Sequence, residues 1–229
     1  MAIIKTKAEI EKVTKACQAT DKIFTKIVHR TDLCTITEIE LRDFILEEIK
    51  KAGLKPSFPP IVTSGKTAGS EIHPEPTKNK LKGFVIIDFG VIYERFMSDM
   101  TRTIYIGTPN KEEKEIYNKL LSVQKECVKL SREGTVAGLL DAQARALLGS
   151  ERKYFIHTLG HGVGTKIHEN PKIFFKDTKS ILKEGMVITI EPGLYVKGKY
   201  GMRIEDTILV TKNAPKILTK SNKNLIIVK

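Results

Sequence analysis

The segment 85–103, VIIDFGVIYERFMSDMTRT, constrains the fold more than any other stretch of the chain. An almost continuous apolar run ends in Asp88, and Asp99 follows after a turn-like middle. An antiparallel hairpin centred between Tyr93 and Glu94 places the two acids directly opposite each other, with Cβ atoms roughly 5 Å apart. Two carboxylates at that distance repel, and one takes up a proton unless a cation lies between them. The pattern predicts a metal site, with an acid pair at a solvated strand edge as the alternative.

Composition limits the classes of protein to which the chain can belong. Of its 229 residues 41% are hydrophobic, enough for a substantial core, and the three cysteines are scattered. Few, unpaired cysteines are typical of a reducing cytosol, so we expect a cytoplasmic protein. No apolar run is long enough to span a bilayer, and we expect no membrane partner. The net charge of +12 would suit nucleic acid, but the lysines are spread along the whole chain and favour a solvated surface.

Capping patterns and apolar residues at helical spacing predict four helices. Their expected positions are from Thr6 onward, from near Thr37 to Gly53, from Asn110 to Gly134 and from Leu139 to Leu148. Besides the hairpin, apolar runs predict strands at Ile61 to Thr63, Tyr154 to Leu159, Met186 to Ile190 and Met202 to Val210.

The order helix, helix, acid-bearing hairpin occurs twice. IDFG at 87–90 is echoed by IEPG at 190–193, and SDMT at 98–101 by IEDT at 204–207, all at offsets close to one hundred residues. A consistent offset favours duplication over chance, although the identity between the repeats is weak. No stretch of linker composition separates them, so we predict one domain, 1–229, with internal pseudo-symmetry. Two facing halves would bring four acids to one centre: Asp88, Asp99, Glu191 and Glu205.

Four carboxylates are too many for one metal ion with an open position, and they suit two divalent ions roughly 3.5–4 Å apart. A histidine would complete the set, and three of the five histidines fall in HTLGHGVGTKIHEN. His161, at the centre of this run, is the preferred ligand, and His157 and His168 are candidates for supporting or proton-transfer groups. For any single histidine a structural role is the plainer alternative, and His29 is expected at the surface. Oxygen-rich ligation with one imidazole favours Mn, Fe, Co or Zn over copper.

Other metal and nucleotide sites are excluded by spacing. His168-Glu169 does not extend to HExxH because Lys172 stands where the second histidine is needed, which excludes a thermolysin-like zinc site. The cysteines lack CxxC spacing, so we expect no structural zinc knuckle. No Walker-type phosphate loop is present.

The motifs GHGVGTKIHENP, ITIEPGLYV and GMRIEDTILVT, with IIDFG and SDMTRT upstream, resemble the metallopeptidases of the pita-bread fold. That family includes methionine aminopeptidases, Xaa-Pro aminopeptidases, prolidases and creatinase. The five motifs occur in the family's order and cover essentially the whole chain. The resemblance implies an α+β fold, with two pseudo-symmetric helix–helix–hairpin halves around a curved antiparallel sheet.

The resemblance also implies a dinuclear site for Mn, Co, Fe or Zn. Position by position, Asp88 would chelate one ion, Asp99 and Glu205 would bridge both, and His161 and Glu191 would hold the other. In this family a metal-bridging water or hydroxide is the nucleophile, and the position of Glu191 also serves as general base. The reaction removes the first residue of a peptide with a free N-terminus.

Three further histidines match family positions around the substrate. His73 and His168 match histidines that contact the substrate or stabilise the tetrahedral intermediate, and His157 matches another pocket histidine. EPGLY and RIEDT resemble the Xaa-Pro branch, whereas methionine aminopeptidases usually carry a histidine where Asp206 stands. Arg203 matches an arginine typical of the Xaa-Pro branch and would brace the last glutamate or an adjacent acid.

The chain departs from the Xaa-Pro branch at its front. It starts almost directly at the catalytic domain, so we expect no N-terminal domain of the creatinase type, and either a monomer or a homodimer. This leaves methionine aminopeptidase activity open. A non-catalytic peptide- or RNA-binding module of the same fold is the alternative from another class, although such proteins usually lose the metal ligands.

Overall fold

The computed structural model describes residues 4–229, and its three longest helices begin where the sequence supplies caps. Thr6, Thr37 and Asn110 each accept a hydrogen bond from the backbone N–H of a glutamate three residues on, and that glutamate bonds back to the cap residue. The predicted helices are therefore confirmed. In chain order the helices are α1 (Lys7–Val28), α2 (Glu38–Lys51), α3 (Gly65–Ala68), α4 (Lys111–Leu130), α5 (Ala137–Leu148) and the 3-10 helix η1 (Gly149–Tyr154).

Two larger sheets lie between the helices, and two smaller ones extend them. One sheet has the order β14-β6-β3-β2, with bounds β2 (Ile61–Ser64), β3 (Gly83–Phe89), β6 (Met100–Ile106) and β14 (Ile226–Val228). The other has the order β13-β12-β9-β7-β8, with bounds β7 (Gly160–Gly162), β8 (Glu169–Ile173), β9 (Val187–Ile190), β12 (Asp206–Leu209) and β13 (Lys216–Ile217). The small sheets contain β1 (Lys55–Pro56), β4 (Val91–Tyr93) and β5 (Phe96–Met97), and β10 (Gly193–Val196) and β11 (Tyr200–Arg203). β14 runs parallel to β6, whereas β3–β6 and β9–β12 are antiparallel.

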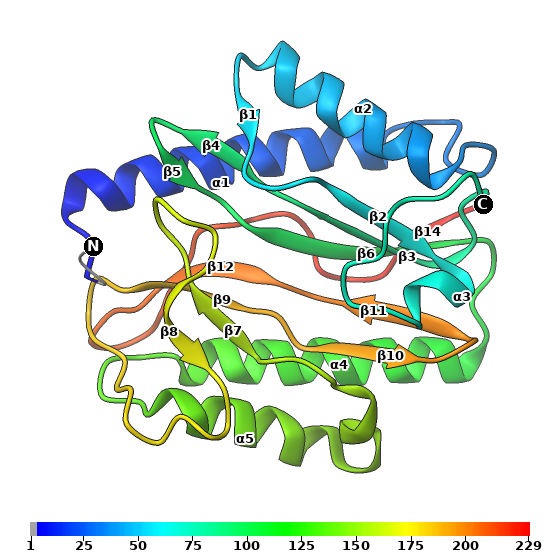
Figure 1. Ribbon diagram of the computed structural model, residues 1–229. Helices are drawn as coiled ribbons and strands as arrows, with labels where there is room; N and C mark the ends of the chain where they lie inside the picture. The colour runs from blue at the N-terminus through cyan, green and yellow to red at the C-terminus, as the bar shows by residue number, and fades with distance from the viewer. Residues whose placement is uncertain (1–3) are drawn as a thin grey trace.

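The layers repeat the order found in the sequence. Figure 1 shows α1 and α2 on one outer side, α4 and α5 on the opposite side, and the strands between them. One apolar cluster packs α1 and α2 on β3 and β6, and another packs α4 and α5 on β9 and β12. Each half is thus two helices on an antiparallel strand pair that carries two acids.

Threonine hydroxyls link the two halves at their centre. Thr103 Oγ1 donates to the carbonyl oxygen of Arg203 at 2.8 Å and accepts from its N–H at 3.1 Å. Thr207 Oγ1 donates to the carbonyl oxygen of Asp99 at 2.7 Å. Because each bond joins a threonine hydroxyl of one half to the backbone of the other half, these bonds fix one hairpin against the other.

The first hairpin turns one residue later than predicted. Tyr93 pairs with Phe96, so the turn is centred between Glu94 and Arg95, whose φ angles are 44° and 74°. Two consecutive left-handed residues are typical of a type I′ turn, whose central residues are most often Asn-Gly or Asp-Gly. Glu-Arg carries no such signal, and the predicted centre was wrong for this reason.

The shifted turn changes how the first two acids meet. Asp88 pairs with Thr101, and Asp99 lies two residues before it, diagonal to Asp88 rather than opposite. Residues two apart on a strand point to the same face, so both acids still face the same cavity. A Cβ at Gly90 would overlap the carbonyl oxygen of Ser98, and the close approach of the two strands there requires glycine.

Two predicted strands differ in the structure. Residues 149–154 form η1, and 155–159 are irregular, because the Arg145 guanidinium donates to the carbonyl oxygens of Phe155 and His157 in place of a neighbouring strand. The predicted strand from Met202 to Val210 is broken at residues 204–205 into β11 and β12. There the N–H of Glu205 donates at 3.1 Å to a carbonyl of the other half.

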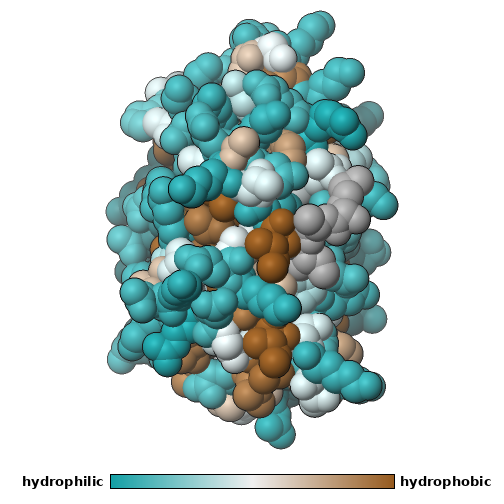
Figure 2. All heavy atoms as spheres, turned by 90° about the vertical axis from the view of Figure 1, so that its left-hand side faces the viewer, coloured by the Kyte–Doolittle hydropathy of each residue, from teal (hydrophilic) through white to brown (hydrophobic). Residues whose placement is uncertain are grey.

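The face in Figure 2 is mainly hydrophilic, with apolar side chains in small groups. His29 is exposed, as expected. Among residues 4–229, no helix is both long and apolar enough to cross a membrane.

Candidate metal centre and its pocket

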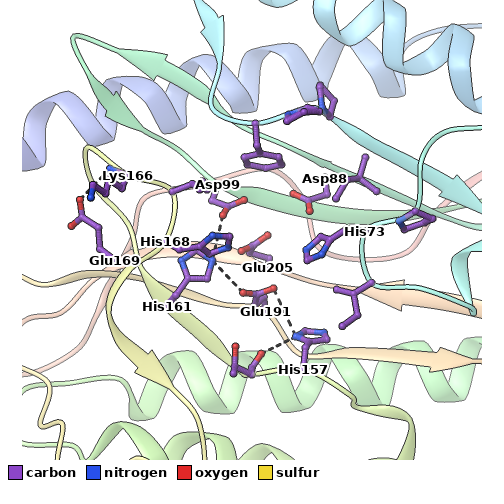
Figure 3. Close-up of a pocket in the computed structure, with 18 of the residues that line it drawn as sticks. His73, Asp88, Asp99, His157, His161, Lys166, His168, Glu169, Glu191 and Glu205 are labelled. Carbon is purple, nitrogen blue, oxygen red and sulfur yellow. Dashed lines mark hydrogen bonds and ion pairs between the residues drawn. The ribbon is translucent and has the colours of Figure 1, made fainter.

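The structure brings all five predicted metal ligands to one cavity of about 1060 Å³. Asp88 lies near the end of β3 and Glu191 directly after β9, whereas Asp99 and Glu205 directly precede β6 and β12. Corresponding places in the two halves thus each supply a carboxylate, from aspartate in the first half and from glutamate in the second. His161 enters from β7, and Figure 3 shows the five side chains converging.

The distances at the centre suit a shared cation. His161 Nε2 lies 3.4 Å from Glu191 Oε1 and 3.6 Å from Asp99 Oδ2. One ligand atom from each of Asp99, His161 and Glu205 lies within 4.8 Å of the others. His161 Nδ1 is 3.0 Å from the carbonyl oxygen of Gly162, which fixes the tautomer with the proton on Nδ1. Burial lowers the pKa of His161 to about 4, so the ring is neutral and Nε2 is available to a cation.

The electrostatics of the acids also favour a cation. Burial raises the pKa of Asp99 and Glu191 well above their usual range, and Glu205 adds negative charge beside both. Burial and the charge of Asp88 raise the pKa of Glu205 to about 8. A divalent ion between these groups would lower their pKa values again, because a nearby opposite charge favours the ionised carboxylate.

Asp88 provides a test of this fit. Its Oδ2 accepts a hydrogen bond from Arg203 Nη2 at 2.6 Å, while its Oδ1 is buried and finds no hydrogen-bond partner among the described residues. Buried carboxylate oxygens without a partner are uncommon and costly. An ion bound by Oδ1 would account for it, and the donor set as a whole fits hard or borderline divalent metals.

Arg203 forms its ion pair with Asp88 rather than with the last glutamate. The buried guanidinium also donates to Thr101 Oγ1 at 3.0 Å and to the hydroxyl of Tyr195 at 2.5 Å. Tyr195 in turn lies 3.1 Å from His157 Nε2, and Thr101 donates to Glu205 at 2.7 Å. Tyr195 and Thr101 were not among the residues predicted from the sequence. The only local signal is their place in EPGLY and SDMT, beside the acids.

The three other predicted site histidines line the same cavity. The His168 ring packs edge-on against His161 with centroids 4.4 Å apart. Burial lowers the pKa of His157 to about 3, and its Nδ1 lies 4.0 Å from Glu191 Oε2. The His73 side chain is exposed at the edge of the cavity, and partial desolvation, followed by the charge of Arg203, lowers its pKa. His73 and His157 are therefore neutral near pH 7.

The walls above the acids differ in character. On one side the segment after β1 contributes Phe58, Pro59 and Pro60, an apolar surface. On the other side Lys166 and Lys172 line the cavity. The cavity therefore combines an acidic floor with an apolar wall, and side chains of both charges border the rest of it, since Glu75 and Glu169 line it as well.

Comparisons with known proteins agree with this arrangement. The sequence model of metallopeptidase family M24 matches residues 11–212 of this chain. An Xaa-Pro dipeptidase from Pyrococcus furiosus is 42% identical over 230 residues, covering 99% of this chain and 66% of that protein. A prolidase structure from Thermococcus sibiricus matches with a TM-score of 0.93 and 39% identity, over 98% of this chain and 62% of the other. The structure of an X-Pro aminopeptidase from Thermotoga maritima matches with a TM-score of 0.92 and 33% identity, over 99% and 65%.

These matches confirm the predicted α+β pita-bread fold. They also set a limit on length. The chain spans about two thirds of the curated relatives that it matches, 66% of one Xaa-Pro dipeptidase and 65% of another. The remaining third of those proteins lies outside the matched region.

Proposed function

Because the chain belongs to metallopeptidase family M24, we propose that it is a metal-dependent exopeptidase that removes the first residue of peptides with proline in second place. The observation that carries the proposal is the meeting of four buried acids and His161 at the floor of one cavity. The names of the relatives, Xaa-Pro dipeptidase and X-Pro aminopeptidase, support the choice of substrate.

We infer that the residues at the floor hold two divalent ions. Asp88, Asp99, His161, Glu191 and Glu205 are the ligands, and Mn, Co, Fe or Zn fits their oxygen-rich set. When bound, such ions polarise a carbonyl group and lower the pKa of a water molecule. The unpartnered oxygen of Asp88 and the raised pKa values of three other acids support this inference.

In this proposal the protein side chains place the substrate and move the proton. Glu191 accepts the proton of the attacking water and returns it to the amine that leaves. His73 and His168, on opposite sides of the acids in Figure 3, donate hydrogen bonds to the carbonyl oxygen as charge develops on it. His157 holds its position through Tyr195 and contacts the substrate.

The charge of the cavity sets the orientation of the peptide. A substrate ammonium group is attracted to the acidic floor, so the first residue lies deepest. The apolar surface of Phe58, Pro59 and Pro60 then takes apolar parts of the peptide. This arrangement suits cleavage of the first peptide bond rather than an internal one.

Hydrolysis assays with the chelated chain and added Mn²⁺ or Co²⁺ test the proposal. The panel compares Ala-Pro and Met-Pro with Met-Ala, and Ala-Pro-Ala with Ala-Pro. Asp99→Asn is the control, because it keeps the shape of the side chain and removes one ligand charge. We expect release of the first residue only before proline, only with metal, and at least 100-fold less in the variant.

Each other outcome has a defined meaning. Release of methionine from Met-Ala at an equal rate would replace the Xaa-Pro assignment by the methionine aminopeptidase alternative. Hydrolysis of Ala-Pro but not Ala-Pro-Ala would restrict the enzyme to dipeptides. No metal binding by isothermal titration calorimetry would overturn the proposal and leave the peptide- or RNA-binding module.

A further inference from the structure

His168 is carried by a short loop whose support lies away from the acids at the floor of the cavity. The His168 loop, residues 163–168, joins β7 to β8, and Lys166, Ile167 and His168 line the cavity from it. Figure 3 shows His168 directed toward His161, whereas the next residue, Glu169, lies on the outer side of the loop. The position of His168 therefore depends on whatever holds this loop.

The Glu169 carboxylate, which also borders the cavity, closes the His168 loop. Its Oε1 accepts the backbone N–H of Thr165 at 2.9 Å and of Lys166 at 3.2 Å. Its Oε2 accepts a hydrogen bond from Lys5 Nζ at 2.6 Å. The two side chains of this ion pair are only 4% and 10% exposed. Burial alone would raise the pKa of Glu169, but Lys5 and the backbone N–H groups outweigh it and keep the pKa below its usual value.

Lys5 is itself fixed to the second half of the fold. Its N–H donates to the carbonyl oxygen of Gly185 at 2.8 Å, and the N–H of Gly185 donates to Val210 at 3.1 Å. The residue directly before the α1 cap is thereby attached beside β12. The charged end of the Lys5 side chain then reaches the His168 loop from a rigid base.

The ion pair packs directly on the loop backbone. A Cβ at Gly164 would lie 2.7 Å from both Glu169 Oε1 and Lys5 Cε, so only glycine leaves room for the pair. The carbonyl oxygen of Gly164 accepts from the N–H of Met97 at 2.8 Å, which holds the start of the loop to β5. The loop is thus held at both ends, by β5 at Gly164 and by the ion pair at Glu169.

We propose that Lys5 and Glu169 are positioning residues that hold His168 at the substrate. The inference rests on the proposed function, because it assigns His168 a place in that reaction. Neither residue reaches the acids at the floor, so metal affinity is unaffected. A displacement of about 1 Å at a group that contacts the reacting atoms costs about 100-fold in rate, and loss of the pair acts through such a displacement.

Kinetics of Lys5→Met test the proposal, because methionine keeps the length of the side chain and removes its charge. We expect kcat with Ala-Pro to fall about 10- to 100-fold, with Mn²⁺ affinity unchanged and Lys5→Arg restoring most of the rate. Lys12→Met is the matched control, because Lys12 forms an exposed ion pair with Glu94 at 3.0 Å. Equal losses in both variants, or a KM change without a kcat change, would overturn the proposal.

A double-mutant cycle separates positioning from general damage. In a His168→Ala background, adding Lys5→Met should lower kcat by less than about 2-fold, because the group that Lys5 positions is already gone. If the two losses multiply instead, Lys5 acts through something other than His168 and the proposal fails. Glu169→Gln serves the same cycle if Lys5→Met does not fold, because it keeps the acceptor oxygen and removes the charge.

Amide hydrogen exchange provides a readout that does not require activity. The Thr165 and Lys166 amides should exchange at least 10-fold faster in Lys5→Met than in the wild-type protein or in Lys12→Met. Unchanged exchange would overturn the role of the pair in holding the loop. If the wild-type protein hydrolyses no peptide while the loop loosens as expected, the proposed function fails and the support of the loop by this pair stands.

Discussion

The free energy of unfolding of the metal-free protein should fall as the pH rises from 6.5 to 8. Burial and the charge of Asp88 raise the pKa of Glu205 from 4.5 to about 8, and burial raises the pKa of Asp99 and Glu191 well above the usual range. A raised pKa means that the folded state holds the proton more tightly than the unfolded state. The stability that it contributes is complete below the unfolded pKa and is lost as the pH rises through the folded pKa.

The size of the effect follows from the pKa of Glu205. Each pH unit between the unfolded and folded pKa costs about 1.4 kcal/mol, so Glu205 alone costs about 2 kcal/mol between pH 6.5 and 8. Asp99 and Glu191 act in the same direction. Burial lowers the pKa of His157 to about 3 and of His161 to about 4. Their opposite contribution, a gain of stability with rising pH, continues until the unfolded histidines have lost their protons, and it offsets about 0.8 kcal/mol of the loss between pH 6.5 and 8.

Urea unfolding followed by circular dichroism measures this loss in the presence of EDTA at pH 6.5 and pH 8. Mn²⁺ at about one hundred times its Kd should add about 2.7 kcal/mol, and its effect should be larger at pH 8. Glu205→Gln, which cannot ionise, should remove about 2 kcal/mol of the pH dependence. A metal-free protein whose stability is constant or rises between pH 6.5 and 8 would refute the reasoning.

Three further substitutions test other parts of the structure, each by urea unfolding. Arg203→Met leaves the buried Asp88 carboxylate without its ion-pair partner and should cost about 3–5 kcal/mol in the metal-free protein; a loss below 1 kcal/mol would contradict the assigned contact. Glu38→Ala removes the acceptor for four hydrogen bonds from β2 and from the segment after His73, and should cost about 3 kcal/mol or more. Thr37→Ala removes only the cap of α2 and should cost about 1 kcal/mol, so it should be clearly milder than Glu38→Ala.

The parts of the fold encoded by near neighbours could be predicted from the sequence. A capping box spans four residues, and its signature at Thr6 and Asn110 placed two helix starts correctly. The hairpin acids could be found because an acid at the end of an apolar strand needs a partner. The turn at Glu94 and Arg95 could not, because tertiary contacts hold two ordinary residues in a left-handed conformation.

The supports of the candidate site were beyond the reach of local patterns. Lys5 and Glu169 are 164 residues apart, and Arg203 and Asp88 are 115 apart. No periodicity or spacing encodes such a pair, and the position-by-position roles came from the resemblance to a family. The strand predicted from Tyr154 to Leu159 was wrong for a related reason, because a side chain from α5 satisfies its carbonyl groups.

The wide spacing of the hairpins has a consequence during synthesis on the ribosome. Thr101 emerges 104 residues before Glu205, to which its hydroxyl donates a hydrogen bond. The strand β6, which begins beside it, also emerges well before its parallel neighbour β14. An unpaired apolar strand edge on a nascent chain is prone to aggregation. The carboxylate of Asp206, beside Glu205, has its ion pair with Lys223, at 2.5 Å, only after residue 223 has been made. A chain released before Glu191 is made holds the acids of the first hairpin without those of the second, and its β6 edge is exposed to other chains, chaperones and proteases.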